Sequence, residues 1–261
     1  MSNEITLDQV KELRDQTGIS IMQCKKALEE SGGDMEKALM VLKKKSSEIA
    51  AKKGDRSAED GLVTVKTDGK KAAVVILSCE TDFVAKNESF VSCADKIANI
   101  ALEQGVEKAR EEASSLIPEL VQKIGEKIEL IDLEVIEGNT IGSYIHHDGK
   151  SGTVVVLEGG DESLAKDVAM HTTAMKPEYI RKEEISSETL EKVKDMFREE
   201  VAGSGKPADI QEKMLEGKIS AYLGEQTLED QPFFKDPNIT VGKLVAQKGA
   251  KIEKFVRKSI R

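Results

Sequence analysis

The chain has 261 residues, of which 39% are hydrophobic and 33% are charged, and its formal net charge is −9 at pH 7. This composition is typical of a globular protein with a highly charged surface, and no apolar run approaches the ~18 residues that a membrane span needs. Residues 1–56 hold 11 basic and 10 acidic side chains, whereas residues 57–261 hold 28 and 38. The larger part therefore repels phosphate backbones, and with 3% aromatic residues a protein partner is favoured over direct contact with nucleic acid.

No residue pattern indicates enzymatic chemistry, a metal or a cofactor. The three histidines lack zinc-like spacing, and the GSGKP fragment at 203–207 has a proline where a phosphate loop needs Ser or Thr. Cys79 ends a β-branched run, which predicts a buried thiol rather than a nucleophile. The start, MSNEITLDQV, has no signal-peptide or transit-peptide features, and three unpatterned cysteines fit a reducing compartment, so a cytoplasmic protein that is not an enzyme is predicted.

Residues 1–54 predict a bundle of three short helices. Thr6 and Gln9 match a capping box, Ser20 and Asp34 are placed as N-caps of the next two helices, and glycines end the first two. The residues predicted for the helix faces that form the bundle core are Leu7, Val10, Leu13, Ile21, Cys24, Ala27, Leu28, Met35, Ala38, Leu39 and Leu42.

The surface and the end of this bundle carry two further signals. Met22 lies off the inner face of the second helix and Arg14 flanks it, so the pair is either incidental surface or a small docking patch. Residues 43–60 carry many charges and almost no large apolar side chains, which predicts a solvated linker with some helix.

The rest of the chain contains an internal repeat. VTVKTDGKKAAVVILSCETDFVAK and SYIHHDGKSGTVVVLEGGDESLAK each indicate a strand, a DGK turn, a second strand, an acidic step and a helix, with the turns at 68–70 and 148–150. A later pair, LVQKIGEKIEL and LVAQKGAKIEKF, also matches. An α+β fold with two similar lobes is predicted, and whether the lobes share one continuous sheet stays open. Lobe 1 comprises residues 55–140, and lobe 2 comprises residues 141–184 and 225–261.

The second copy is longer than the first by about 44 residues, because the offset between copies grows from 80 at the DGK turns to 124 at Gly125 and Gly249. The insert, residues 185–224, has two helical stretches around the breaker at 203–207, which predicts an antiparallel coiled-coil hairpin. Its seam fits either self-association or contact with a partner. The predicted seam residues are Leu190, Val193, Phe197, Val201, Ile210, Met214, Ile219 and Tyr222.

The segment TDFVAKN, residues 81–87, stands at the turn from strand to helix in the first copy. Thr81 or Asp82 is placed to cap the helix, and Phe83 falls in its first turn. Two interpretations are open: Phe83 anchors the helix to the core, or Asp82 and Phe83 form an exposed tip that wedges into a partner. In the second copy, Leu164 stands near the place of Phe83.

The sequence resembles the bacterial elongation factor Ts family, the guanine-nucleotide exchange factors of the GTPase elongation factor Tu. The resemblance covers nearly the whole chain and implies an N-terminal ubiquitin-associated-like bundle, a two-lobed α+β core and an inserted coiled-coil hairpin. Some members continue past the position of Arg261 into a further helical module, and the resemblance implies no contact of that module for this chain. Besides TDFVAKN, the matching blocks are VKELRDQTG at 10–18, CKKAL at 24–28, KIGE at 123–126, AMH at 169–171 and KPEYI at 176–180.

The resemblance also implies how the chain meets the GTPase. Its lobe 1 tip would reach the magnesium side of the nucleotide pocket and release GDP, so that GTP can bind, while the bundle and lobe 2 dock on the partner. No contact with nucleic acid or membrane is expected, and a homodimer through the core or the hairpin stays open. The implied partner-binding residues are Thr81, Asp82, Phe83 and Val84 in lobe 1, Arg14, Ile21 and Met22 in the bundle, and His146 in lobe 2.

A second class of function is compatible with the same sequence. Small helical bundles are common adaptors, so the chain could capture a partner through its bundle without any effect on nucleotide. An enzyme is a third interpretation, but no motif names a substrate.

Overall fold

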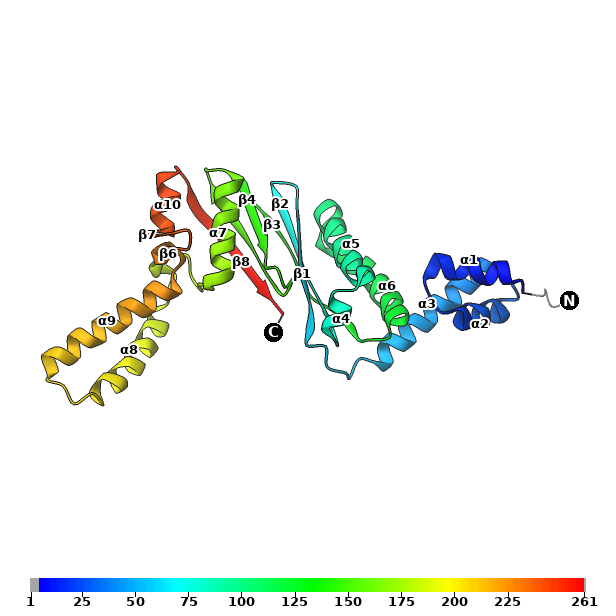
Figure 1. Cartoon of the computed structure of the whole chain (residues 1–261), viewed down its shortest axis with the longest axis horizontal. Coiled ribbons are helices and arrows are strands. Elements are labelled where there is room, and N and C mark those ends of the chain that lie inside the picture. Colours follow the sequence, from blue (N-terminus) through cyan, green and yellow to red (C-terminus); the bar gives the residue numbers. More distant parts are fainter. Residues whose placement is uncertain (1–4, 261) are drawn as a thin grey trace.

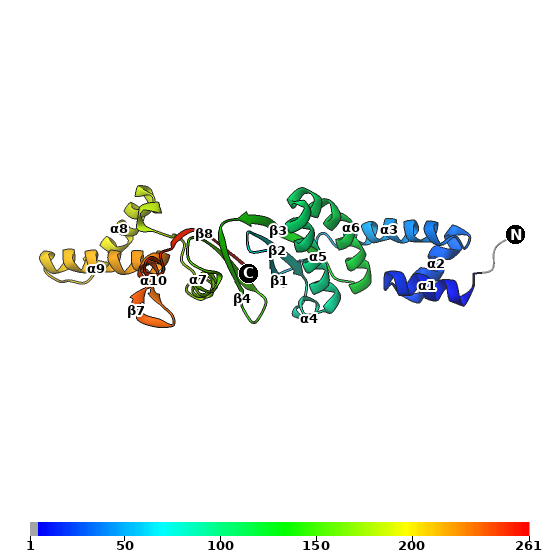
Figure 2. The ribbon, with the colours of Figure 1, turned by 90° about the horizontal axis from the view of Figure 1, so that it is seen from above.

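The computed structural model describes residues 5–260, and the predicted α+β class is confirmed. The molecule is elongated, with a helical bundle at one end, a helical hairpin at the other and two sheets between them (Figure 1). The view from above shows the same order along the long axis (Figure 2). Within residues 5–260, none of the helices is both long enough and apolar enough to cross a membrane.

The ends of the three bundle helices follow the predicted caps. Thr6 and Gln9 make the reciprocal hydrogen bonds of a capping box. Ser20 and Asp34 each accept a hydrogen bond from the backbone N–H three residues further on, and Gly18 ends the first helix at a φ of 67°. The helices are α1 (Leu7–Thr17), α2 (Ile21–Ser31) and α3 (Met35–Lys52).

Three residues predicted for the inner faces of the bundle are exposed instead. Leu7 is 87% exposed, Ile21 58% and Leu39 37%. Leu7 and Ile21 are the first residues of their helices, at the margin of the bundle, and Leu39 lies beside the buried stripe that Ala38 and Leu42 form. The prediction for these residues was wrong because helical spacing defines a face but does not say how far the neighbouring helices cover it.

Most of the predicted linker is helical, because α3 continues to Lys52. Ser46 on this extension is buried, and Ile49 and Ala50 pack against the core of lobe 1. These small and apolar side chains recur at helical spacing among lysines, so the high charge of residues 43–60 concealed a narrow packing face.

In lobe 1, helices cover one face of an antiparallel sheet with the strand order β1-β2-β3. The central strand, β2, is buried along almost its whole length. In the turn before it, Asp68 accepts hydrogen bonds from the N–H groups of Lys70 and Lys71, and Gly69 adopts a φ of 91°. The elements are β1 (Asp60–Thr67), β2 (Lys71–Cys79), α4 (Asp82–Ala85), α5 (Glu88–Gln104), α6 (Val106–Ile124) and β3 (Ile128–Glu137).

Lobe 2 repeats this arrangement with the strand order β4-β5-β8, which confirms the internal repeat. The ladder register shifts between Ile76 and Leu77 in lobe 1 and between Val156 and Leu157 in lobe 2, again 80 residues apart. A small β6–β7 sheet, which the sequence did not predict, also forms. The elements are β4 (Thr140–Ile145), β5 (Ser151–Glu158), α7 (Glu162–Met175), η1 (Lys182–Glu184), η2 (Leu228–Asp230), β6 (Pro232–Phe233), β7 (Asp236–Thr240), α10 (Val241–Gln247) and β8 (Lys251–Ser259).

The two three-stranded sheets are separate and pack against each other through an apolar cluster. The N–H of Val63 in β1 donates to the carbonyl of Gly149 in the second DGK turn at 2.8 Å. An ion pair at 2.9 Å joins Lys150 to Asp60 across the same boundary. The buried residues of the cluster are Val63, Ala72, Val74, Ile76, Ile136, Ile141, Val154 and Val156.

The inserted segment forms two helices, α8 (Ser187–Ala202) and α9 (Ala208–Gln226), joined at the predicted breaker. Phe197 and Tyr222 meet edge to face with ring centroids 5.9 Å apart. No residue of α9 is fully buried. The hairpin therefore depends on a thin seam in which Val193 and Val201 of α8 are buried, while the apolar side chains of α9 stay partly open to water.

Candidate functional site

Within the TDFVAKN segment, Asp82–Ala85 form a single helical turn, α4, between β2 and α5. Thr81, rather than Asp82, caps it by accepting a hydrogen bond from the N–H of Val84 at 3.4 Å. Asn87 then caps α5 by accepting from the N–H two residues on. The one helix predicted here is thus two helices, because Asn87 starts a new one.

Phe83 and Val84 have opposite environments on this turn. Phe83 is 82% exposed, whereas Val84 is 8% exposed and belongs to the core of lobe 1. The core-anchor interpretation of Phe83 is therefore wrong, and Val84 is the anchor. Leu164, also 8% exposed, follows Val84 by 80 residues, so Leu164 is the counterpart of Val84, and exposed Ser163 takes the place of Phe83.

The backbone before α4 is held by a carboxylate from beyond the end of α6. Glu126 accepts hydrogen bonds from the N–H groups of Glu80 and Thr81 at 3.1 and 3.0 Å, and from the Thr81 hydroxyl at 2.7 Å. Burial, with smaller contributions from the charges of Glu126 and Asp60, raises the pKa of the Cys79 thiol to about 12. Cys79 is therefore protonated at neutral pH, as expected for a buried thiol that is not a nucleophile.

Asp82 points outward beside Phe83 and forms an ion pair with Lys86 at 2.9 Å. The side chains are 47% and 75% exposed, so the pair is well hydrated and contributes little to stability. The carboxylate of Asp82 is therefore available to a partner. We refer to residues 81–84 as the α4 tip.

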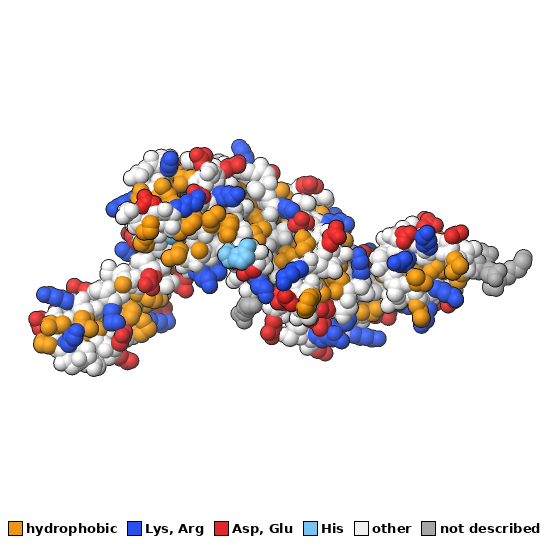
Figure 3. Space-filling view, viewed as in Figure 1, with side chains coloured by type: hydrophobic (Ala, Val, Ile, Leu, Met, Phe, Trp, Pro, Cys, Tyr) orange, Lys and Arg blue, Asp and Glu red, His pale blue; other side chains and the backbone are white. Residues whose placement is uncertain are grey.

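A cavity of about 520 Å³ brings the α4 tip together with the second DGK turn. Asp82 and Lys86 line it from lobe 1, and His147 and Asp148 line it from lobe 2. The exposed histidine side chains lie near the middle of the face shown in Figure 3. Two segments from different copies of the repeat, far apart in the sequence, thus form one surface.

His146 lies beside this surface rather than in the same cavity. It is half-buried, its Nδ1 is 3.4 Å from the Tyr144 hydroxyl, and its ring centroid is 4.3 Å from that of His147. It lines a different cavity, of about 440 Å³, together with Arg257 and Lys150. The structure therefore brings His147, which the sequence did not single out, closer to the α4 tip.

The three predicted docking residues of the bundle are all exposed. Arg14 lies on α1, and Ile21 and Met22, which are 58% and 69% exposed, begin α2. The bundle also exposes Leu7 and Met40, at 87% and 71%, which the sequence did not single out for binding. The bundle surface therefore offers several apolar side chains to a partner.

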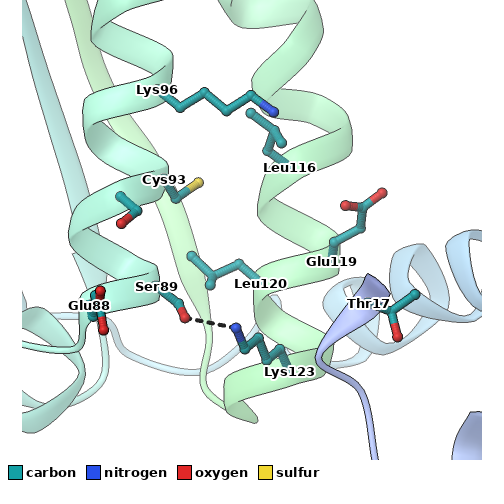
Figure 4. A pocket seen from close by; sticks show the side chains of 10 residues that line it. Thr17, Glu88, Ser89, Cys93, Lys96, Leu116, Glu119, Leu120 and Lys123 are labelled. Atoms are coloured by element: carbon teal, nitrogen blue, oxygen red, sulfur yellow. Dashed lines mark hydrogen bonds between the residues drawn. The ribbon is translucent and has the colours of Figure 1, made fainter. Parts of the chain in front are cut away.

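The bundle joins lobe 1 near the start of α5, the helix that follows the α4 tip. Thr17 lies across a pocket of about 380 Å³ from α5 and α6, and in this pocket Lys123 donates to the Ser89 hydroxyl at 2.8 Å (Figure 4). Gln122 of α6 donates to Gln23 of α2 at 3.0 Å and accepts from Ser46 of α3. The end of α6 thus contacts both the bundle and the start of α5, just after the α4 tip.

Comparison with known proteins finds relatives along nearly the whole chain. A family model described as "Elongation factor TS" matches residues 80–261, which include the α4 tip and lobe 2. The elongation factor Ts of Idiomarina loihiensis is 40% identical, with 97% of this chain and 90% of that protein covered. Those of Psychromonas ingrahamii and Methylococcus capsulatus are 41% and 43% identical, with 98% and 97% of this chain and 91% of each relative covered.

The chain belongs to the elongation factor Ts family. It is therefore an elongation factor of protein biosynthesis with a nucleotide-exchange role, which confirms the resemblance found in the sequence.

Within the described range 5–260, no group of three or more His, Cys, Asp or Glu side chains is arranged to hold a metal ion. The sequence analysis missed Glu126, which accepts hydrogen bonds at the start of the TDFVAKN segment. Its available signals were its place in KIGE and its replacement by Ala250 in the second copy.

Proposed function

We propose that this member of the elongation factor Ts family binds elongation factor Tu carrying GDP and releases the nucleotide by disturbing its magnesium and phosphate site. The observation that carries the proposal is that Phe83 is 82% exposed on a short helix, while the next residue, Val84, is anchored in the core. An aromatic ring held away from its own core is available for burial in another protein. The proposed location is the cytoplasm, and nucleic acid and membranes are not proposed partners.

The exchange mechanism is a linkage between two ligands of the GTPase. A GTPase holds its nucleotide largely through phosphate contacts and magnesium. An exchange protein that prefers the rearranged, magnesium-free pocket weakens nucleotide binding. By linkage, the nucleotide weakens the affinity of the exchange protein by the same ratio. GTP then binds as the exchange factor leaves, with no covalent bond made or broken by this chain.

Phe83 and Asp82 supply different parts of this preference. Burying the Phe83 side chain in the partner contributes roughly 1.5–3 kcal/mol, enough to stabilise a displaced segment of the GTPase. Asp82 brings a negative charge toward a site whose phosphates need positive compensation, so it disfavours the bound nucleotide. Thr81 and Val84 hold these two side chains in place.

Docking is proposed to involve all parts of the molecule. Arg14, Ile21 and Met22 of a ubiquitin-associated-like bundle (residues 1–54) would bind the nucleotide-binding domain of the GTPase, and His146 of lobe 2 would contact it elsewhere. Residues 185–224 would form the coiled-coil hairpin between the two segments of lobe 2. Whether that hairpin also joins two copies is tested by light scattering of the full chain against a version that lacks residues 187–222.

The decisive experiment is release of fluorescent GDP from the cognate elongation factor Tu. We expect saturating wild-type protein to accelerate release, and Phe83→Ala to reduce the acceleration at least about tenfold with an unchanged melting temperature. Ile131→Ala is the control, since Ile131 is a large apolar side chain that is 55% exposed on β3 and is not part of the α4 tip. Tight binding by the wild type without accelerated release would instead support the adaptor, which uses its bundle and has no exchange activity.

A further inference from the structure

One carboxylate determines the local geometry of the α4 tip. Glu126 Oε2 accepts from the N–H groups of Glu80 and Thr81, while Oε1 accepts from the Thr81 hydroxyl. Because the Thr81 hydroxyl donates its hydrogen to Glu126, its oxygen lone pairs face the N–H of Val84, which it caps. Glu126 thereby orients Thr81, the residue that caps α4.

Hydrogen bonds run in both directions between the segment at Glu80 and the segment at Glu126 and Lys127. The Glu80 side chain accepts from the N–H of Lys127 at 2.6 Å and forms an ion pair with Arg56 at 3.2 Å. Lys127 also donates to the carbonyls of Gly54 and Arg56, both at 2.8 Å. The base of the tip is thus connected to the end of α6 and to the segment after α3.

The repeat provides an internal comparison for this attachment. Ala250 occupies the place of Glu126, 124 residues later, and Gly160 occupies the place of Glu80. In lobe 2 the helix is capped directly by the carboxylate of Asp161, which accepts from the N–H of Leu164 at 2.8 Å. We call the three hydrogen bonds that Glu126 accepts from Glu80 and Thr81 the Glu126 clamp. The clamp is present in lobe 1, which exposes Phe83. In lobe 2, Ala250 stands in place of Glu126 and Ser163 in place of Phe83.

We propose that Glu126 is a positioning residue for nucleotide exchange: it holds the backbone at Glu80 and Thr81 so that Phe83 projects in the orientation that enters the partner. This inference rests on the proposed function. A single helical turn has little stability of its own, so α4 depends on its cap and on the Val84 anchor. Loss of the clamp leaves Phe83 present but free to sample other orientations, which lowers the rate more than the affinity.

The test measures exchange and backbone protection in the full-length protein. We expect Glu126→Ala to lower the maximal GDP-release rate about tenfold, while the concentration for half-maximal effect changes less than about threefold. Hydrogen exchange at the amides of Glu80 and Thr81 should accelerate. Glu126→Gln keeps an acceptor oxygen and should restore most of the rate. Glu103→Ala, an exposed acid near the end of α5, is the control for loss of a surface charge.

A double-mutant cycle with Phe83→Ala separates positioning from direct contact. If Glu126 acts through Phe83, the double variant is no slower than Phe83→Ala alone. Additive losses, or faster amide exchange with a wild-type release rate, would overturn the inference. If Phe83→Ala itself leaves the release rate unchanged, the proposed function fails, and the amide-exchange result still reports whether the clamp exists.

Discussion

Lobes 1 and 2 share their sheet order, their DGK turns and the position of their register shift, yet they present different helix starts to solvent. In lobe 2, α7 runs unbroken from Glu162 to Met175 behind its Asp161 cap. In lobe 1 the equivalent start is the separate turn α4, because Asn87 caps a new helix. The two copies of the repeat share the sheet and differ at the helix start, which is where the exposed Phe83 lies.

The break in lobe 1 also changes which side of the following helix is buried. Val168, Ala169 and Thr172 are buried in lobe 2, but of the residues 80 positions earlier Glu88 and Ser92 are exposed and Ser89 is half-buried. The helix therefore packs on its sheet in a shifted register, and the α4 turn is separate from it. In lobe 1 the residues buried along α5 are Phe90, Cys93, Ala94, Ile97, Ala98 and Ala101.

The largest expected effect concerns the two matched anchors. We expect Leu164→Ala to lower the free energy of unfolding by about 2–5 kcal/mol and Val84→Ala by about half as much, because the smaller side chain leaves a smaller cavity. Urea denaturation of the full chain measures both. Losses below about 0.5 kcal/mol for both variants would mean that these residues do not anchor their helices.

The approach of helix to sheet in lobe 2 gives the next effect. A Cβ on Gly142 of β4 would lie 2.2 Å from the backbone of Ala165 and Lys166 in α7, a clash that backbone atoms cannot relieve without displacing the helix. We expect Gly142→Ala to cost about 3 kcal/mol in the same denaturation experiment. Gly217→Ala is the control, since Gly217 lies in α9 with no atom within 4 Å of the added Cβ, and it should be neutral or stabilising.

Exchanging the residues at positions 83 and 163 tests whether the aromatic ring acts only when it stands on the α4 turn beside the Glu126 clamp. We expect Phe83→Ser to reduce GDP release at least about tenfold. Adding Ser163→Phe should not restore the rate, because lobe 2 lacks the separate turn and the Glu126 clamp. Both substituted positions are exposed, so unfolding free energies should change by less than about 0.5 kcal/mol. Recovery of GDP release in the double variant would contradict the role assigned to the α4 turn and the Glu126 clamp.

The smallest effect is the pH dependence of stability that the histidines contribute, and it falls on lobe 2 because all three histidines lie there. His171 is buried, with its Nε2 2.9 Å from the Gln231 side-chain oxygen and its Nδ1 accepting from the N–H of Phe234 at 3.3 Å. Burial lowers the pKa of His171 below 6.5, although the contact with Gln231 opposes this shift. Protonation of Nδ1 would also place a second donor against the Phe234 N–H.

The sign follows from comparing the two states. Below about pH 6.5 the unfolded chain binds a proton at His171 more readily than the folded chain, so the free energy of unfolding falls as the pH decreases, by at most ~1.4 kcal/mol per pH unit. Denaturation at pH 7.5 and pH 5.5 should show this loss, and it should shrink in His171→Asn. An unchanged pH dependence in that variant would assign the loss to other groups.

Much of the local structure could be predicted from the sequence, because it depends on residues that are close in the chain. The caps at Thr6 and Asp34, the turn at Asp68 and the 80-residue repeat are all short-range patterns, and the structure confirms them. The prediction of some helix in residues 43–60 was right, but the predicted solvation was wrong at Ser46, which is buried against α6 by a contact 76 residues away in the chain. The second cap at Asn87 was missed because the segment also fits one continuous helix.

The sequence by itself determined the family, the two copies of the repeat and TDFVAKN as the segment of interest, since these depend only on residue identity and spacing. Only the tertiary structure decided that Val84 faces the core and Phe83 faces water, because burial depends on which elements the fold packs around a helix. It also decided that Glu126, 45 residues after Thr81, holds the tip. Hydrogen bonds across such separations form where the chain returns in space, and residue spacing alone does not specify that return.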